Sequence, residues 1–244
     1  MHVLLDASCT GAENMRRDDL LLARAEPVLR LYGWSPETVS LGNSQTERDV
    51  DLDAIRDLGL DTVKRGTGGG GILHNATEVT YAVVLPIDFP GLPRDLPRSF
   101  AYLSQGVVTA LRALGVPAEL EVVGDLTREA LCYVRKQGTN VVVAGKKISG
   151  GAQRRTRLAV LQHGTIIVDR DEHRLSRIFR TPLDTVCARV TSLHLADLDP
   201  SRAAITDALV AGFAETFGPL TPLTWSDLPA PPTADEPTAS RLPG

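Results

Sequence analysis

The chain has 244 residues, of which 43% are hydrophobic and 23% charged, and a formal net charge of −4 at pH 7. This composition is typical of a globular protein with its own core and excludes a fibrous or wholly disordered chain. Three cysteines without paired spacing argue against a disulfide framework or a structural zinc site, so no metal is expected. A mildly acidic balance, no export signal and no apolar run of membrane-spanning length predict a cytoplasmic protein with no nucleic-acid or membrane partner.

Hydrophobic periodicity predicts strands and helices in alternation along the first half of the chain. Strands are expected at 3–5, 28–32, 38–41, 61–64 and 78–85, and helices at 11–26 and 51–58. Ser8 or Thr10 is suited to cap the first helix, and Gly59 to end the second. The Gly/Pro break at 33–36 predicts a hairpin between the second and third strands.

The second half begins with a Pro-rich stretch at 87–97, which predicts a surface loop. Helices are then expected at 98–115, 174–179 and 201–217, and strands at 119–123, 140–143 and 158–168. Lys146 and Lys147 are expected in a turn, with Gly150 and Gly151 interrupting the approach to the last strand. Pro and Ala dominate from Asp227 onward, so residues 1–226 are expected to form the folded domain and 227–244 a disordered tail.

A glycine-rich loop at 66–71 is the first candidate ligand site. Gly66, Gly68 and Gly71 satisfy G-x-G-x-x-G, but strand-like sequence follows where a dinucleotide site needs a helix. A P-loop would need Gly-Lys-Ser/Thr at its end, and Ile72 follows instead. Four successive glycines do let the backbone approach a carboxylate, phosphate or acyl carbonyl. The loop therefore predicts a ligand contact, with a flexible hairpin loop as the alternative.

Five blocks, in order, resemble the lipoate/biotin protein ligase and octanoyltransferase superfamily, in particular its lipoate branch. Residues 31–42, LYGWSPETVSLG, and Gln45 are similar to the motif R-F-Y-x-W-x-P-x-x-x-S-x-G and the residue after it. Residues 64–74, KRGTGGGGILH, resemble R-R-x-T-G-G-x-x-V-x-H, and residues 78–81, EVTY, resemble E-L-T-Y. Residues 145–155, GKKISGGAQRR, resemble G-K-K-I-x-G-S-A-Q-x-R, and residues 161–166, LQHGTI, resemble L-Q-H-G-S-I. The chain departs from these motifs at Lys64, Asn75 and Gly151, where Arg, Asp and Ser are usual.

The resemblance implies a single α/β (α+β) catalytic domain with a mixed, largely antiparallel sheet flanked by helices. It also implies acyl chemistry on a protein lysine, by a route that depends on whether a cysteine nucleophile is present. Cys132-Tyr133, 15 residues before Lys147, resembles the Cys-Phe element that precedes G-K-K-I in cysteine-dependent octanoyltransferases and lipoyl amidotransferases. A thiolate can hold an acyl group as a thioester, and a nearby ammonium lowers the pKa of a thiol.

The residue roles follow from this resemblance. Cys132 is expected to be the nucleophile, and Lys147 to stabilise the thiolate and the developing oxyanion. The substrate-binding residues implied are Arg65, Gly68, Gly69, Gly70, Gly71, His74, Gly150, Gly151, Ala152, His163 and Gly164. The alternative for Cys132 is an inert core thiol, and the alternative for His74 and His163 is a hydrogen-bonded core histidine. Cys187 is the competing nucleophile, although it lacks the N-P-C-G-Y context of the other octanoyltransferase branch.

The expected reaction moves an octanoyl group from acyl carrier protein to a lysine of a lipoyl-carrier domain and requires no cofactor. The acceptor is expected to be the glycine cleavage H protein or a 2-oxoacid dehydrogenase subunit. An ATP-dependent lipoate–protein ligase, which would use ATP and Mg, and a lipoyl amidotransferase are the enzymatic alternatives. An inactive acyl- or carrier-protein-binding module is the non-enzymatic one. Arg154, Arg155 and Arg157 are candidates for docking an acidic carrier protein, or else form a solvated strand edge.

Overall fold

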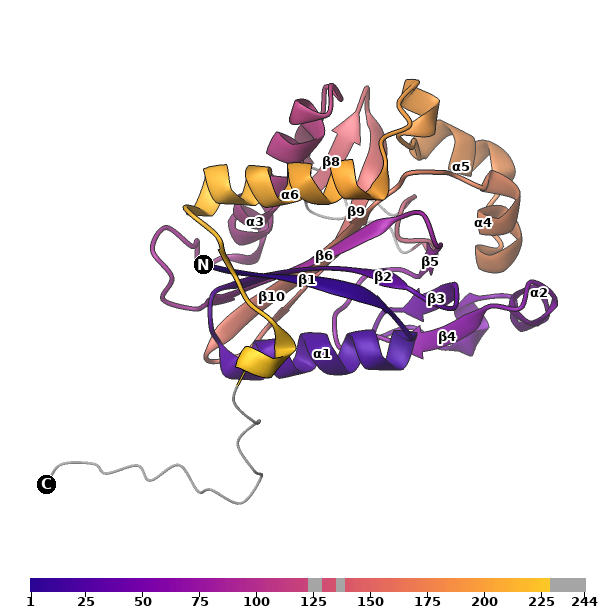
Figure 1. Cartoon of the computed structure of the whole chain (residues 1–244). Coiled ribbons are helices and arrows are strands. Elements are labelled where there is room, and N and C mark those ends of the chain that lie inside the picture. The colour runs from indigo at the N-terminus through magenta and orange to yellow at the C-terminus, as the bar shows by residue number, and fades with distance from the viewer. Residues whose placement is uncertain (123–128, 135–138, 229–244) are drawn as a thin grey trace, which may run out of the picture.

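A large mixed sheet forms the centre of the molecule (Figure 1). The computed structural model describes residues 1–122, 129–134 and 139–228. Within them the sheet has eight strands in the order β11 (Thr221–Pro222), β1 (His2–Cys9), β2 (Val28–Trp34), β6 (Val79–Pro86), β10 (Ala159–Ile166), β9 (Lys146–Arg155), β8 (Thr139–Val143) and β7 (Glu119–Val122). β1 runs parallel to β2 and β11, and the other neighbours are antiparallel. The expected mixed, largely antiparallel sheet is confirmed.

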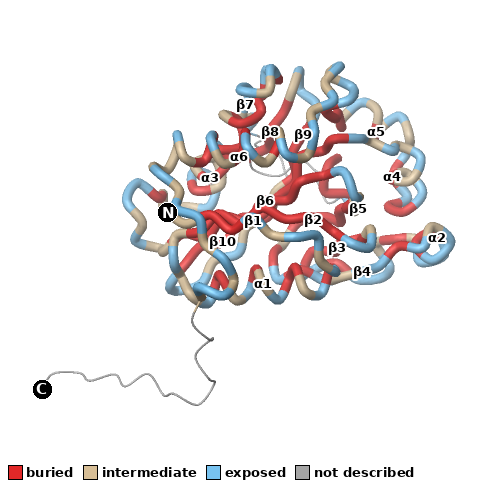
Figure 2. The backbone as a smooth tube through the Cα atoms, viewed as in Figure 1, coloured by how far each residue is buried: buried red, intermediate tan, exposed pale blue. Residues whose placement is uncertain are grey.

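Helices cover both faces of this sheet. α3 (Leu96–Ala113) and α6 (Arg202–Phe217) lie together on one face, and α1 (Gly11–Arg24) lies across the other (Figure 1). The main apolar core fills the space between the sheet and the α3–α6 pair, and the buried residues follow the strands in Figure 2. Gly212 of α6 faces the carbonyl of Gly106 in α3, so the two helices approach at backbone contact distance.

A smaller three-stranded sheet lies beside the large one. Its order is β4 (Asp61–Lys64), β3 (Thr38–Leu41) and β5 (Ile72–His74), with β3 parallel to β4 and antiparallel to β5. The shorter helices around it are α2 (Leu52–Asp57), α4 (Glu172–Phe179), α5 (Leu183–Arg189) and the 3-10 turn η1 (Glu47–Asp49). A second apolar cluster joins this sheet to α4, α5 and the segment around Cys132. The glycine loop therefore connects two strands of the smaller sheet.

Side-chain caps fix where the helices begin. Thr10 accepts a hydrogen bond from the Glu13 amide at the start of α1, as the sequence predicted. α3 starts two residues earlier than expected because Asp95 caps it, and Pro97 is tolerated in the first turn, where no partner for its missing N–H is needed. Gly59, with a φ of 64°, follows the end of α2.

Two expectations about the strands are wrong. The strands at 28–32 and 38–41 exist but form no hairpin, because β2 pairs with β1 and β6 while β3 belongs to the other sheet. The chain crosses between the sheets through a cis Ser35–Pro36 peptide. Lys146, Lys147, Gly150 and Gly151 do not form a turn or an interruption but lie within β9, where Gly150 pairs with Thr165 and Gly151 with Gly164 of β10.

The C-terminal part of the described chain returns to the large sheet. The 3-10 turn η3 (Trp225–Asp227) is closed by Asp227, whose carboxylate accepts from the Thr224 amide, and Leu228 packs on the cluster around Leu4 and Leu21. The expected tail at 227–244 thus overlaps the described chain in two residues, and 229–244 lie outside the described residues. None of the helices in the described ranges is long and apolar enough to cross a membrane.

Candidate active site

Arg65, at the end of β4, organises the glycine loop. Its guanidinium is buried, with 3% of the residue exposed, and all five of its N–H groups have acceptors. Nε donates to the Thr67 hydroxyl, Nη1 to the Ser40 carbonyl and hydroxyl, and Nη2 to the carbonyls of Gly68 at 2.9 Å and Gly70 at 2.8 Å. The loop is therefore wound around a fixed positive charge, and Gly69 takes the left-handed conformation, with φ of 94°, that closes it.

Two hydroxyl–histidine–carboxylate chains support this arginine. Thr67 Oγ1 lies 2.7 Å from His163 Nε2, and His163 Nδ1 lies 2.8 Å from a carboxylate oxygen of Asp18. Since a guanidinium can only donate, the Thr67 hydroxyl accepts from Arg65. Since an ionised carboxylate can only accept, His163 carries a proton on Nδ1 and donates a hydrogen bond to Asp18. The first chain thus links Arg65 to a buried carboxylate.

The second chain has the same order of groups on the other side of Arg65. Ser40 Oγ lies 2.8 Å from His74 Nε2, and His74 Nδ1 is hydrogen-bonded to Glu78. Trp34 stacks on the His74 ring, with centroids 3.8 Å apart and planes inclined by 10°. Ser40 accepts from Arg65 and donates to His74, which fixes the same Nδ1–H tautomer.

Burial sets the ionisation of these groups. It lowers the pKa of His74, because the charged imidazolium would lose its hydration, and the carboxylate of Glu78 only partly opposes this. Burial would raise the pKa of Asp18, but hydrogen bonding to His163 and the charge of Arg30 hold it below its ordinary value. Arg30 Nη1 donates to Asp18 at 2.7 Å. Burial therefore favours a neutral His74 in the second chain, while the first chain ends on an ionised Asp18.

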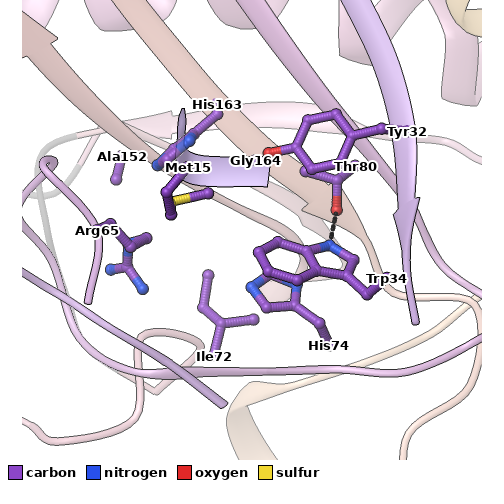
Figure 3. A pocket seen from close by; sticks show the side chains of 10 residues that line it. All are labelled: Met15, Tyr32, Trp34, Arg65, Ile72, His74, Thr80, Ala152, His163 and Gly164. Atoms are coloured by element: carbon purple, nitrogen blue, oxygen red, sulfur yellow. Dashed lines mark hydrogen bonds between the residues drawn. The ribbon is translucent and has the colours of Figure 1, made fainter. Parts of the chain in front are cut away.

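A narrow cavity lies against these residues (Figure 3). It is lined by Met15, Tyr32, Trp34, Arg65, Ile72, His74, Thr80, Ala152, His163 and Gly164. Its volume of about 10 Å³ is room for about one water molecule. The lining is largely apolar, while Arg65 and the two histidines supply polar groups (Figure 3).

Cys132 is held directly against the glycine loop. Its amide donates to the Gly71 carbonyl at 2.9 Å, and the Gly71 amide donates to the Ala130 carbonyl at 2.7 Å. Gln45 Nε2 donates to the same Ala130 carbonyl at 2.9 Å. A Cβ on Gly70 would lie 2.7 Å from the Cys132 amide nitrogen, so that position requires glycine. The backbone of Cys132 therefore lies against the glycine loop, and the residue is buried, with 2% exposed.

β9 passes on the other side of Cys132. Lys147 is buried and its Nζ donates to the Cys132 carbonyl at 3.0 Å. A Cβ on Gly150 would lie 3.8 Å from Cys132 Sγ and 2.8 Å from the Tyr133 ring. Burial lowers the pKa of Arg65, and the negative charge that Cys132 can carry opposes this lowering in part. Two buried cations, Lys147 and Arg65, therefore lie within electrostatic range of this thiol.

The other two cysteines lie elsewhere. Cys187 is on α5, partly exposed, with its Sγ 3.8 Å from Arg170 Nη2. Lys146 Nζ donates to the Cys187 carbonyl, so this thiol also has cations nearby, but no described contact joins it to the glycine loop. Cys9 ends β1 and is partly exposed.

The structure gathers most of the expected site residues. Arg65, the glycines at 68–71, His74, Cys132, Lys147, Gly150, Ala152, His163 and Gly164 surround the loop and the cavity. Gly151 instead faces α3, where a Cβ would lie 3.2 Å from Phe100. Arg154 is also near the loop: its guanidinium lies beside Gly66 and pairs with Asp19 of α1 at 2.8 Å.

Sequence reasoning assigned no role to four polar residues of the two chains. Ser40, Thr67 and Glu78 lie inside the blocks that resemble the family. For Thr67 and Glu78 the available signal is a spacing of two residues from Arg65 and of four residues from His74. Asp18 lies outside those blocks. Its signal is a charged residue on the apolar side of α1, one turn after the buried Asn14.

Sequence comparisons identify the family of this chain. Residues 10–214 match the model of the lipoyl protein ligase A/B catalytic domain, and the chain belongs to that family. The relatives include the octanoyltransferase LipM of Kyrpidia tusciae, which is 37% identical over 86% of this chain and 84% of its own length. LipM of Bacillus subtilis is 33% identical, over 75% of this chain and 70% of its own.

Solved structures give the same family. A T. acidophilum protein with bound lipoic acid superposes with a TM-score of 0.78 and 25% identity, covering 91% of this chain and 88% of the other. A lipoate-protein ligase A bound with ATP gives a TM-score of 0.76 and 26% identity, covering 93% and 90%. The mixed sheet flanked by helices is therefore the fold of this family of lipoate enzymes.

Proposed function

We propose that the chain is an octanoyltransferase of protein lipoylation that works through a thioester on Cys132. Relatives with this activity in their names are 33–37% identical to the chain and covered over 70% or more of their length. The observation that supports the mechanism is the position of Cys132. Its amide is hydrogen-bonded to the Gly71 carbonyl of the glycine loop, and its carbonyl accepts from Lys147 of β9. Both contacts are made by the backbone of Cys132, and they place the residue between the loop and β9.

The proposed reaction has two steps and needs no oxidant or reductant. In the first, the Cys132 thiolate attacks the acyl thioester of the donor, a new carbon–sulfur bond forms, and the donor thiolate leaves and takes up a proton. In the second, the amine of an acceptor lysine attacks the acyl-Cys132 carbonyl, an amide forms and the Cys132 thiolate is released. The amine loses one proton to solvent. Lys147 and Arg65 stabilise the thiolate and the oxyanion of each tetrahedral intermediate.

The donor in this proposal is octanoyl-acyl carrier protein, and an arginine cluster supports it. The basic patch consists of Arg94, Arg98, Arg154, Arg155 and Arg157, around the β9–β10 turn and the start of α3. Arg155 donates to the carbonyls of Pro93 and Arg94 and so joins the two segments. Leu96 and Leu158 are exposed beside it. Positive charge around apolar side chains suits an acidic carrier protein.

The acceptor in this proposal is a lipoyl-carrier domain, such as the glycine cleavage H protein or a 2-oxoacid dehydrogenase subunit. The reaction is proposed to take place in the cytoplasm. In this proposal the transfer needs no nucleotide. The alternative is ATP-dependent lipoate ligation, which the similarity to an ATP-bound ligase favours, with Arg65 and the glycine loop against an acyl phosphate. Lipoyl amidotransfer between carrier proteins would use the same Cys132 and Lys147 with a different donor.

The deciding experiment is the intact mass of the protein after incubation with octanoyl-acyl carrier protein, without ATP. Wild type, Cys132→Ala and Cys187→Ala are compared. We expect a hydroxylamine-labile octanoyl adduct on wild type and Cys187→Ala and none on Cys132→Ala. If no form is acylated while lipoate with MgATP yields a bound acyl-adenylate, the chain is a ligase and Cys132 is structural.

A further inference from the structure

A second cavity, which we call the polar cavity, lies beside the residues that follow Cys132. It has a volume of about 150 Å³, which is room for several water molecules, and it shares no lining residue with the narrow cavity of Figure 3. Its wall is built from three strands, one helix and the chain after the proposed nucleophile. The polar residues of the wall are Glu121 of β7, Asn140 of β8, Lys147 of β9, Arg189 of α5 and Tyr133.

The polar cavity reaches the backbone of the proposed nucleophile. Tyr133 and Val134, which directly follow Cys132, line it. Lys147 lines it as well, and its Nζ donates to the Cys132 carbonyl at 3.0 Å. The thiol is close by, because a Cβ on Gly150 would lie 2.8 Å from the Tyr133 ring and 3.8 Å from Cys132 Sγ. A group bound in the polar cavity is therefore a near neighbour of Cys132.

Charges of opposite sign line the polar cavity at different depths. Glu121 is exposed, at the solvent side. Lys147 is buried, with 6% exposed, and Arg189 is partly buried, with its Nη1 donating to the Val134 carbonyl at 3.0 Å. Tyr133 is buried, and its phenol oxygen has no hydrogen-bond partner among the described residues, so it can donate one hydrogen bond and accept another. A group that enters would therefore pass a carboxylate and then meet cations and an unpaired hydroxyl.

This order of charges suits the amine of a lysine. The second step of the proposed reaction needs a neutral amine, whereas a free lysine, with a pKa of about 10.4, is an ammonium at neutral pH. The Glu121 carboxylate attracts the ammonium. Lys147 and Arg189 then disfavour its charge and so lower its pKa, which releases the reactive neutral form. An anionic ligand would meet the carboxylate first, and an apolar chain would leave the polar wall unpaired.

The position of the polar cavity also suits a substrate with a short reach. A lysine has only a four-carbon stem and is carried on a folded domain, so its amine must enter close to the acyl group. The basic patch lies at the other end of β9, where Arg155 is about 16 Å along the strand from Gly150, at about 3.3 Å per residue. A carrier protein docked at the patch needs a long arm to span this length. Donor and acceptor would thus approach Cys132 from opposite ends of β9.

We propose that the polar cavity is the entry site for the acceptor lysine, separate from the surface on which the donor docks. This inference rests on the proposed function. The ammonium releases one proton to solvent, and the neutral amine attacks the acyl carbon on Cys132. The C–N bond forms, the C–S bond breaks, and the thiolate returns as a second proton goes to solvent. Glu121 guides the amine into the cavity, and Lys147 and Arg189 keep it neutral there.

Glu121→Arg tests this, because the residue is exposed and the change reverses the charge at the entrance. Octanoyl-Cys132 is formed first and then mixed with the unlipoylated glycine cleavage H protein, and the transfer is followed in a single turnover. We expect the second-order rate constant of transfer to fall about tenfold at low salt, since an attractive charge becomes a repulsive one. The rate at which octanoyl-acyl carrier protein acylates Cys132 should stay at the wild-type value, because the thiol and the basic patch are untouched.

The matched control is Glu119→Arg. It makes the same change of charge on the same strand, at an exposed residue that does not line the polar cavity. Transfer to the acceptor should stay near the wild-type rate. Hydroxylamine, a small neutral nucleophile, should cleave the thioester equally fast in wild type and both variants, which shows that the reactivity of the acyl group is unchanged.

Arg189→Gln gives a second readout, in the pH profile of the transfer step. It removes one cation from the wall, and the other ionisable groups there, Glu121, Tyr133 and Lys147, remain. Because a cation lowers the pKa of the bound amine, its loss should move the rising limb of the profile to higher pH. Partial unfolding of the variant would lower the height of the profile and leave its midpoint in place.

The outcomes separate this inference from the proposed function. If Glu121→Arg transfers at the wild-type rate, or if the two glutamate variants are slowed equally, the acceptor enters elsewhere and the thioester mechanism stands. An unmoved midpoint for Arg189→Gln overturns the inference as well. If wild type forms no octanoyl-Cys132, the proposed function fails, and this inference fails with it.

Discussion

At the scale of single residues, Arg65 is a buried cation with no carboxylate in direct contact. An unpaired charge of this kind carries a desolvation penalty of several kcal/mol. Here the penalty is offset through polarised chains, Thr67–His163–Asp18 and Ser40–His74–Glu78, that end on carboxylates. Arg65 lines the cavity and interacts electrostatically with Cys132. The arginine can therefore hold the loop and favour an anion at the thiol at the same time.

These chains predict a loss of stability in weak acid. Because the pKa of His74 is lowered in the fold, the unfolded chain takes up this proton at higher pH than the native protein does. The contribution of His74 is complete above its ordinary pKa near 6.5 and is lost as the pH falls below it. Between pH 7.5 and pH 5 we expect the free energy of unfolding to drop by at most about 2 kcal/mol from this group.

Urea unfolding at both pH values measures this effect. His74→Gln, which cannot be protonated, is the matched variant, and the difference in pH dependence between it and wild type isolates His74 from the other histidines. Equal pH dependence in the two proteins would mean that His74 is not held neutral. Asp18, whose pKa is lowered, contributes a separate loss that begins only below about pH 3.8.

At the scale of elements, β9 shows where periodicity fails. Its sequence, KKISGGAQRR, has no regular alternation and only one β-branched residue, Ile148, yet it pairs with β8 and β10. The glycines are there because Tyr133 and Phe100 pack against the backbone at Gly150 and Gly151. That reason is a tertiary contact, which local sequence cannot reveal. The wrong prediction of a hairpin at 33–36 has the same origin, because the partners of a strand are determined by contacts with residues far away in the sequence.

The resemblance grouped the expected site residues better than periodicity placed the elements that carry them. The resemblance brought Cys132, Lys147, His163 and the glycine loop into one set, and the structure gathers them. It could not supply Asp18, because the chain that uses it is built from α1 outside the resembling blocks. Fixed motifs indicate which residues touch the site, whereas the buried charges that hold them follow from packing.

Gly150→Ala tests whether β9 must lack a side chain beside the thiol. Its Cβ would lie 2.8 Å from the Tyr133 ring, so the ring and Cys132 must move. We expect Cys132 acylation to fall more than tenfold and stability to fall by about 1–3 kcal/mol, as for an overpacked core. Gly151→Ala, whose Cβ meets Phe100 at 3.2 Å on the α3 side, is the comparison and should acylate faster than Gly150→Ala. The opposite order of rates would place the sensitive contact elsewhere.

At the scale of the whole molecule, the charge is unevenly arranged. The chain has a net charge of −4, yet five arginines gather around the β9–β10 turn and the start of α3. Through Arg154 this basic patch reaches Gly66 of the glycine loop. A carrier protein held there would have its thioester arm near the cavity, while the rest of the acidic surface would repel it. The patch would thus set the orientation of docking as well as its rate.

Charge reversal of the basic patch tests this arrangement. For Arg94→Glu/Arg157→Glu we expect KM for octanoyl-acyl carrier protein to rise about tenfold at low salt. A rise of this size corresponds to the loss of about 1–2 exposed charge pairs between the two proteins. The rate with a small octanoyl thioester should not change, because the thiol and its cations are untouched. Arg48→Glu/Arg56→Glu, on η1 and α2, carries the same change in net charge away from the patch and should leave KM near wild type. Equal KM values for the two double variants would mean that only net charge matters and that the carrier protein docks elsewhere.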